Sequence, residues 1–178
     1  MRIGVVAIKT MSAVFLLLCL ALTTRAPGQV AAASSRKPAP TFSLADATGT
    51  PIRLPDYKGK VVLLNFWATW CHGCKTEIPW YIEFQDKWKA RGLAVIGASM
   101  DDDGWKVVKP FDKVKRMNYP VVIANDNLAK EYGLGAMPLS VLIDREGKIA
   151  DSHSGVVDRH VWEQEIQALL DEHGQGAH

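Results

Sequence analysis

Cysteine is scarce in this chain, which has only Cys19, Cys71 and Cys74 among its 178 residues. A small domain that relies on a disulfide framework usually carries several cysteine pairs. A bridge between Cys71 and Cys74 closes a loop of only four residues. Such a bridge stabilises a fold by about 2 kcal/mol, against roughly 4 kcal/mol or more for a long loop. A structural staple is therefore a poor explanation for this pair.

A basic stripe is also missing. The chain has 21 Lys and Arg residues against 19 Asp and Glu residues, which gives a net charge of +2. Its densest basic group, Lys113, Lys115 and Arg116, fits the solvated face of a helix. Nucleic-acid-binding domains concentrate positive charge on one face, so we expect no nucleic-acid partner.

The N-terminal apolar stretch is too short for an ordinary membrane span. Met11–Leu22 has fewer residues than the roughly 20 that cross a bilayer. It follows the positive residues Arg2 and Lys9 and precedes a run of small residues ending at Ala33, which is the pattern of an export signal. We predict that residues 1–33 are a cleaved signal peptide, with an uncleaved N-terminal anchor as the alternative.

Both alternatives place the rest of the chain outside the cytoplasm, in the periplasm or at the outer face of the cytoplasmic membrane. This part is one domain, residues 34–178, with a folded core of about 38–173. Cys19 leaves with the signal or stays in the membrane, so the domain keeps only Cys71 and Cys74. Contact with the membrane is expected only through an uncleaved N-terminus.

Apolar runs of strand length alternate with helical patterns along the domain, and no repeat is evident. This order predicts a mixed sheet with helices on both faces. Strands are expected at Thr41–Leu44, Pro51–Leu54, Val61–Trp67, Leu93–Met100, Tyr119–Ala124, Leu139–Asp144 and Lys148–Ser154, and helices at Cys71–Arg91, after Trp105, at Leu128–Leu134 and at Asp158–Leu170.

Two groups of polar residues receive plain structural interpretations. Asp101–Asp103 precede a predicted helix, so we expect them to cap its N-terminus rather than to bind a metal. Four histidines, His153, His160, His173 and His178, form no recognisable constellation and are expected at the surface.

The stretch "WATWCHGCKTEIP" carries the chemistry. Cys71 follows a buried strand and opens a helix, where unpaired backbone N–H groups and the helix dipole stabilise a thiolate. Cys74 lies one turn further and can resolve a mixed disulfide. We therefore predict that Cys71 is the exposed nucleophile and that Cys74 is the shielded resolving thiol.

The segment "VVLLNFWATWCHGCKTEIP" resembles the active-site segment of thioredoxin-fold proteins, most closely that of the exported TlpA/ResA-type thiol–disulfide oxidoreductases, which include cytochrome c maturation reductases. "APTFSLADATGTPIRLPDYKGK" is similar to the N-terminal hairpin of that family, and Ser99–Tyr119 to its inserted segment. The resemblance implies a thioredoxin-like α/β fold: a central mixed sheet flanked by helices, with an N-terminal β-hairpin and an inserted helix-containing segment.

The resemblance also implies roles for single residues. "GLGAMPLSVLIDREGKI" matches the strand with the family's cis-proline, so Pro138 is expected to be cis beside the sulfurs, with the backbone of Met137 free to pair with a substrate chain. Glu77 matches the family's glutamate, which could accept the proton of Cys74; an exposed helix glutamate is the alternative. Thioredoxins carry a buried Asp at the position of Asn65, which cannot titrate.

Two neighbours of the cysteines remain open to interpretation. His72 replaces the Gly of the Gly-Pro pair of thioredoxins; if protonated, it would stabilise the Cys71 thiolate, and otherwise it is an exposed loop residue. Trp70 and Trp67 are expected to flank the site as an apolar wall, although Trp67 fits the core equally well.

The predicted function is reduction of protein disulfides by the Cys71/Cys74 dithiol, with electrons from a membrane thiol carrier and no cofactor or metal. Apocytochrome c and copper-site cysteines are candidate substrates. The alternatives are a copper-handling module that uses the same cysteines and a peroxiredoxin-like peroxidase. The peroxidase motif needs Pro and Thr where this chain has Leu64 and Ala68, and covalent haem attachment needs a His where Lys75 follows Cys74.

Overall fold

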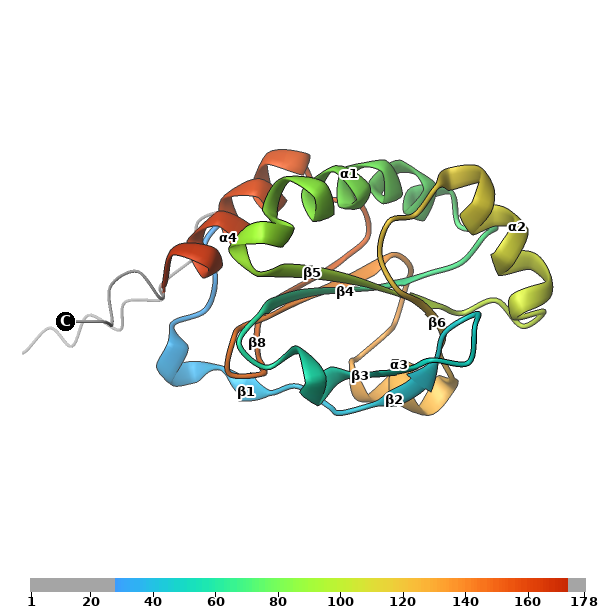
Figure 1. Ribbon diagram of the computed structural model, residues 1–178. Coiled ribbons are helices and arrows are strands. Elements are labelled where there is room, and N and C mark those ends of the chain that lie inside the picture. The colour runs from blue at the N-terminus through green and yellow to red at the C-terminus, as the bar shows by residue number, and fades with distance from the viewer. Residues whose placement is uncertain (1–27, 173–178) are drawn as a thin grey trace, which may run out of the picture.

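The computed structural model describes residues 28–172. The predicted signal or anchor up to residue 27, including Cys19, lies outside the described residues, as do His173 and His178. In Figure 1 the described chain forms a twisted central sheet with helices above and below it.

Six strands make up the central sheet. Their order is β1 (Lys37–Pro38), β8 (Lys148–Ser154), β7 (Leu139–Ile143), β4 (Val61–Trp67), β5 (Leu93–Ser99) and β6 (Val121–Ile123). The sheet is mixed, because β4, β5 and β6 are parallel while β7 runs antiparallel to both β4 and β8. A separate antiparallel hairpin joins β2 (Ser43–Ala45) to β3 (Pro51–Arg53).

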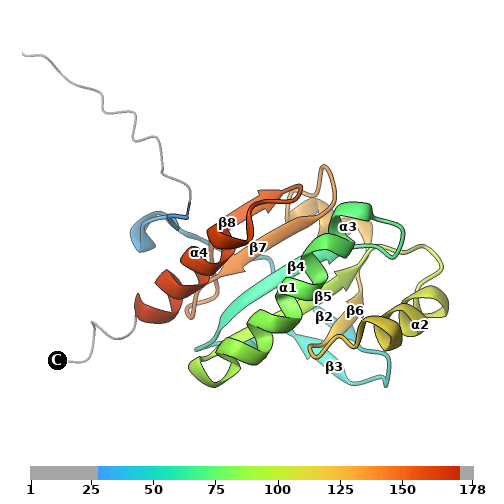
Figure 2. The same cartoon turned by 90° about the horizontal axis from the view of Figure 1, so that it is seen from above.

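The two central strands are covered on both faces. All seven residues of β4 and all seven of β5 are buried, which explains why their sequences are continuous apolar runs rather than alternating patterns. One face carries α1 (His72–Trp88), α4 (Arg159–Asp171) and α2 (Trp105–Lys115), and the other carries α3 (Asp126–Glu131) and the β2–β3 hairpin. Figure 2 shows α1 lying along β4 and β5, with α4 beside it.

The predicted thioredoxin-like architecture is confirmed. The predicted strand over residues 61–67 has the observed bounds of β4, and the predicted first helix corresponds to α1 followed by a 3-10 turn, Lys89–Arg91, which ends at Gly92. None of the helices between residues 28 and 172 combines the length and apolar composition needed to cross a bilayer.

The capping role predicted for the acidic run is wrong. The N-cap of α2 is Gly104, and no side-chain hydrogen bond caps that helix. Asp101 is instead buried, and its carboxylate accepts a hydrogen bond from the loop before Cys71. The rule for helix caps considers only neighbours in sequence, whereas this carboxylate pairs with a residue 32 positions earlier.

Residues just after position 27 lie against the domain. The Ala31 N–H donates to Ala150 O on β8 at 2.9 Å, and Val30 packs against the core. Arg36 then forms a buried ion pair with Asp144 at 3.1 Å. A boundary at Ala33 therefore stays a prediction, and some residues before it contact β8.

Candidate redox site

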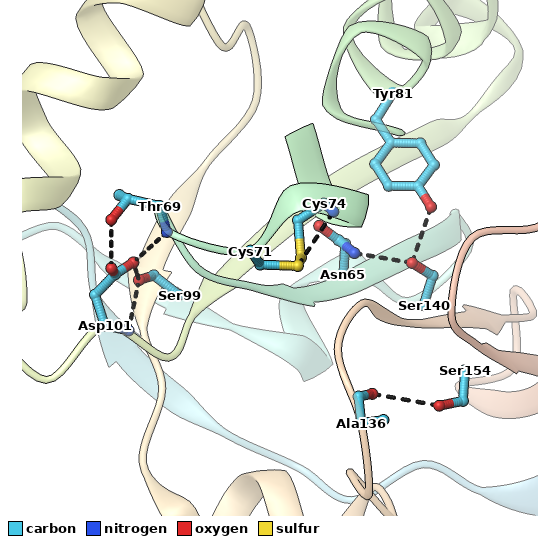
Figure 3. Close-up of a disulfide and its surroundings, with 10 residues drawn as sticks. All are labelled: Asn65, Thr69, Cys71, Cys74, Tyr81, Ser99, Asp101, Ala136, Ser140 and Ser154. Carbon is cyan, nitrogen blue, oxygen red and sulfur yellow. Dashed lines mark hydrogen bonds between the residues drawn. A yellow bond between two sulfur atoms is a disulfide. The ribbon is translucent and has the colours of Figure 1, made fainter. Parts of the chain in front are cut away.

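Cys71 and Cys74 form a disulfide at the start of α1 (Figure 3). Cys71 is the N-cap residue, with extended backbone, and its Sγ accepts a hydrogen bond from the Cys74 N–H at 3.1 Å. Such an N–H, at the positive end of a helix dipole, would also stabilise a thiolate on Cys71 after reduction. The geometry thus matches the sequence argument for the nucleophile.

The predicted exposure of Cys71 is wrong for this disulfide form. Cys71 is 6% exposed and Cys74 is 0% exposed. The order of accessibility agrees with the prediction, because Cys71 is the more exposed of the two. The loops that carry Pro138 and Val156 lie close to Gly73, between the two cysteines.

One of those loops carries the cis peptide bond between Met137 and Pro138, as the family resemblance implied. A Cβ placed on Gly73 would lie 3.2 Å from Pro138 Cδ and 2.8 Å from Val156 Cγ2. Position 73, directly before Cys74, is therefore glycine for a steric reason, because a side chain there would collide with Val156. Pro138 packs directly on the Cys-x-x-Cys turn, which places Met137 at its edge.

The aromatic and apolar side chains near this turn differ in their exposure to solvent. Trp70 is 66% exposed, and Val156 is 46% exposed. Trp67 is fully buried and packs on Phe111, with ring centroids 5.2 Å apart. Trp67 thus belongs to the core, whereas Trp70 presents an apolar surface next to Cys71; His72 is exposed beside it.

Glu77 is not the surface residue that the alternative interpretation assumed. It lies one turn beyond Cys74 and is 0% exposed. Its Oε1 accepts from Trp162 Nε1 at 3.3 Å, and its Oε2 has no hydrogen-bond partner among the described residues. Burial raises the pKa of Glu77, while nearby hydrogen bonds and the charge of His153 act in the opposite direction.

Three neutral side chains near the disulfide are linked by hydrogen bonds (Figure 3). Asn65 Nδ2 donates to Ser140 Oγ at 2.8 Å, and that oxygen lies 2.9 Å from the hydroxyl of Tyr81. Burial raises the pKa of Tyr81 well above its ordinary value. Where thioredoxins carry a carboxylate, this protein therefore has a hydrogen-bonded chain that stays uncharged. Sequence reasoning missed Ser140 and Tyr81, although a tyrosine on the buried face of a helix needs a partner for its hydroxyl.

Asp101 accepts three hydrogen bonds at the opposite side of the disulfide (Figure 3). Oδ2 accepts from Thr69 N at 2.9 Å and from Ser99 Oγ at 2.8 Å, and Oδ1 accepts from Thr69 Oγ1 at 2.6 Å. Strand register explains the proximity, because Trp67 and Ser99 are paired at the ends of parallel β4 and β5.

His153 also departs from its predicted place at the surface. Its Nε2 lies 2.9 Å from Glu165 Oε2 and 3.5 Å from Asp151 Oδ2, and its ring packs edge-on against Trp162. Burial raises the pKa of Glu165, which His153 partly offsets. His160 is exposed, as expected.

Asp151, His153 and Glu165 place possible ligand atoms within 4.8 Å of one another. Across residues 28–172, no group of three or more potential metal ligands includes either cysteine. His153 and these two acids form a half-buried polar cluster. The cysteines themselves have the geometry of a dithiol/disulfide couple: one sulfur at a helix start, one buried sulfur behind it, and a buried carboxyl one turn further.

Comparisons with known proteins agree with this geometry. The family model for the AhpC/TSA family matches residues 36–152. The chain is similar to thiol-disulfide oxidoreductase ResA of Bacillus thuringiensis subsp. konkukian, with 36% identity over 134 residues, 75% of this chain and 77% of the relative. It is also similar to the thioredoxin-like protein YneN of Bacillus subtilis, with 34% identity over 130 residues, 72% of this chain and 76% of the relative.

Solved structures show the same fold. A thiol:disulfide interchange protein of the thioredoxin family from Chlorobium tepidum TLS superposes with a TM-score of 0.70 at 29% identity, covering 78% of this chain and 99% of that one. StoA from Bacillus subtilis superposes with a TM-score of 0.61 at 26% identity, covering 72% and 97% of the two chains.

Proposed function

The chain belongs to the AhpC/TSA family and is a thiol–disulfide oxidoreductase of the thioredoxin fold, and from this premise we propose that it reduces protein disulfides outside the cytoplasm. The observation that carries the mechanism is the buried Glu77 carboxyl, one helical turn beyond the buried resolving cysteine. The family resemblance favours the reducing direction. The signal-like N-terminus supports the compartment.

The proposed reaction begins with the reduced protein. The Cys71 thiolate attacks one sulfur of a substrate disulfide, forming a mixed disulfide and releasing the other substrate sulfur as a thiolate. Cys74, once deprotonated, attacks Cys71 Sγ and releases the second substrate thiolate. The substrate gains two electrons, and the protein is left with the Cys71–Cys74 disulfide seen in the structure.

Glu77 accepts the proton that Cys74 must lose. Residues three apart on a helix lie on the same face, so the carboxyl and the Cys74 thiol share the buried side of α1. A carboxylate with a raised pKa is a stronger base than an exposed one, and burial raises the pKa of Glu77. A base is most useful to a thiol that must deprotonate inside the protein.

Four residues are proposed to contact the substrate chain. Pro138 and Met137 border the Cys-x-x-Cys turn, where the Met137 backbone pairs with an extended peptide. The exposed Trp70 provides apolar contact. His72, also exposed, lies at the helix start, where positive charge stabilises the Cys71 thiolate.

The substrate class follows from the chemistry of the site. A recessed dithiol suits a protein disulfide presented on a flexible segment, and apocytochrome c and copper-site cysteines are the candidates. An oxidising compartment does not keep the dithiol reduced, so a membrane thiol carrier supplies the electrons.

Trapping tests this proposal. Cys74→Ser removes the resolving thiol and leaves the start of α1 intact, so mixed disulfides with Cys71 should accumulate in the exported compartment. The matched control is the Cys71→Ser/Cys74→Ser double variant, which should trap nothing. Mass spectrometry of the conjugates identifies the substrate; recovery of a cytochrome or a thiol carrier supports the proposal. No conjugate, together with stoichiometric copper on the wild type, would favour the copper-handling alternative.

A further inference from the structure

The loop before Cys71 is held by a single buried carboxylate. Asp101 is 5% exposed and accepts hydrogen bonds from the backbone N–H of Thr69, from the Thr69 hydroxyl and from the Ser99 hydroxyl, at 2.6–2.9 Å. Buried carboxylates are costly unless hydrogen-bonded. Because three donors from Thr69 and Ser99 satisfy this carboxylate, its position in the loop is well defined.

Thr69 is the middle of the turn that presents the nucleophile. β4 ends at Trp67, the Cys71 N–H donates to Ala68 O at 3.1 Å, and Cys71 then caps α1. The Met100 N–H donates to Trp67 O at 2.8 Å, so Asp101 itself is anchored to the end of β4. The carboxylate thus joins the end of β5 to Thr69, two residues before Cys71.

We propose that Asp101 is a positioning residue for thiol–disulfide exchange: it holds the Thr69–Trp70 turn so that Cys71 Sγ faces the N–H groups at the start of α1. The inference rests on Cys71 as the attacking sulfur. Asp101 touches neither sulfur through any hydrogen bond; it acts through Thr69. Without the Asp101 carboxylate, Thr69 loses two hydrogen bonds. The Cys71 thiolate then loses part of its stabilisation by the N–H groups at the start of α1.

Substitutions can separate geometry from charge at this position. In Asp101→Asn the amide oxygen can accept from the Thr69 N–H and the Ser99 hydroxyl, and the amide NH2 can donate to the Thr69 hydroxyl, which reverses its role. The asparagine therefore keeps three hydrogen bonds and removes the charge. Asp101→Ala removes both, and Thr69→Val removes one hydroxyl bond while keeping the backbone N–H.

The experiment measures the pH dependence of alkylation of the reduced full-length protein, with mass spectrometry to identify the labelled cysteine. We expect Asp101→Ala to move the Cys71 midpoint to higher pH and to slow labelling near neutral pH about threefold to tenfold, the scale of a helix N-terminus acting on an adjacent anion. Asp101→Asn should keep most of the wild-type profile, Thr69→Val should lie between, and the exposed neighbour variant Asp102→Ala should not differ from wild type.

Other outcomes overturn the inference. If Asp101→Asn and Asp101→Ala both move the midpoint to lower pH, the carboxylate acts by its charge and not by position, because removing a nearby negative charge favours a thiolate. Unchanged profiles in Asp101→Ala and Thr69→Val also refute it. Should Asp101→Ala fail to fold, the comparison of Thr69→Val with Asp101→Asn decides. Wild-type labelling at Cys74 first would instead refute the assignment of Cys71 as nucleophile.

Discussion

Trp162 on α4 donates its indole N–H to the buried carboxyl of Glu77 on α1, at 3.3 Å. The same indole packs edge-on against His153, with ring centroids 4.8 Å apart. The last helix of the fold therefore supplies a side-chain hydrogen bond to Oε1 of Glu77, and the Tyr81 hydroxyl and the Val157 backbone also favour the ionised carboxyl. These donors are neutral, so they orient the carboxyl and leave it able to exchange a proton. This arrangement leads to two predictions.

The first prediction concerns stability. The pKa of Glu77 is raised above its ordinary value of 4.5 in the folded protein, chiefly by burial. The folded state therefore favours the protonated carboxyl, and the free energy of unfolding should fall as the pH rises from about 4.5 through the raised pKa. Glu77→Gln keeps an acceptor for Trp162 and cannot ionise.

Urea unfolding at a series of pH values checks this. The advantage of Glu77→Gln over wild type should be small below pH 4 and should grow toward pH 7, by about 1.4 kcal/mol for each pH unit by which the pKa is raised. Asp86→Asn, an exposed position on the same helix, is the control and should show no such growth. A difference that shrinks with rising pH would contradict the sign.

The second prediction concerns kinetics. If Glu77 accepts the proton of Cys74, Glu77→Gln should slow the resolution of a mixed disulfide near neutral pH, by about 10²-fold or more in keeping with the usual worth of a general base. The first attack by Cys71 should change little. Rapid-quench measurements of the mixed-disulfide population separate the two steps, and equal slowing of both would argue for a general structural effect.

Local sequence patterns predicted most of the fold. The run Val61–Trp67 has strand length, β-branched residues and no polar break except Asn65, and its bounds agree with β4. The Cys71 helix start followed from its position directly after that strand. Both features depend on residues close together in sequence, where spacing is informative.

The missed contacts are long-range. Asp101 bonds to Thr69, and Glu77 bonds to Trp162, 85 positions later. His153 meets Glu165 because β8 and α4 pack together. Nothing in the neighbourhood of these side chains marks a partner, so local rules assigned a helix cap and a surface histidine instead. Family resemblance identified Glu77 but not the indole that orients it.

The third prediction tests the steric fit between the cysteines. In Gly73→Ala the new Cβ would lie 2.8 Å from Val156 Cγ2 and 3.2 Å from Pro138 Cδ. The strain should lower the free energy of unfolding of the oxidised protein by about 1–3 kcal/mol. Thermal unfolding measures it. Gly135→Ala, where no atom lies within 4 Å of the added Cβ, is the matched control, and adding Val156→Ala should restore part of the loss.

The last prediction concerns the redox potential. Thioredoxin lies at about −270 mV and the strongly oxidising extreme at about −120 mV, and we expect the potential of this protein to lie between them.

His72 is exposed next to Cys71 at the helix start, so in its protonated form it stabilises the thiolate and hence the reduced state. His72→Ala should therefore make the potential more negative. Equilibration with a glutathione buffer and quantification of the disulfide measures the potential, with the exposed His160→Ala as control. A potential that does not depend on His72 would leave the helix start alone as the source of thiolate stabilisation. A wild-type value near −120 mV would instead indicate that the protein forms disulfides rather than reducing them.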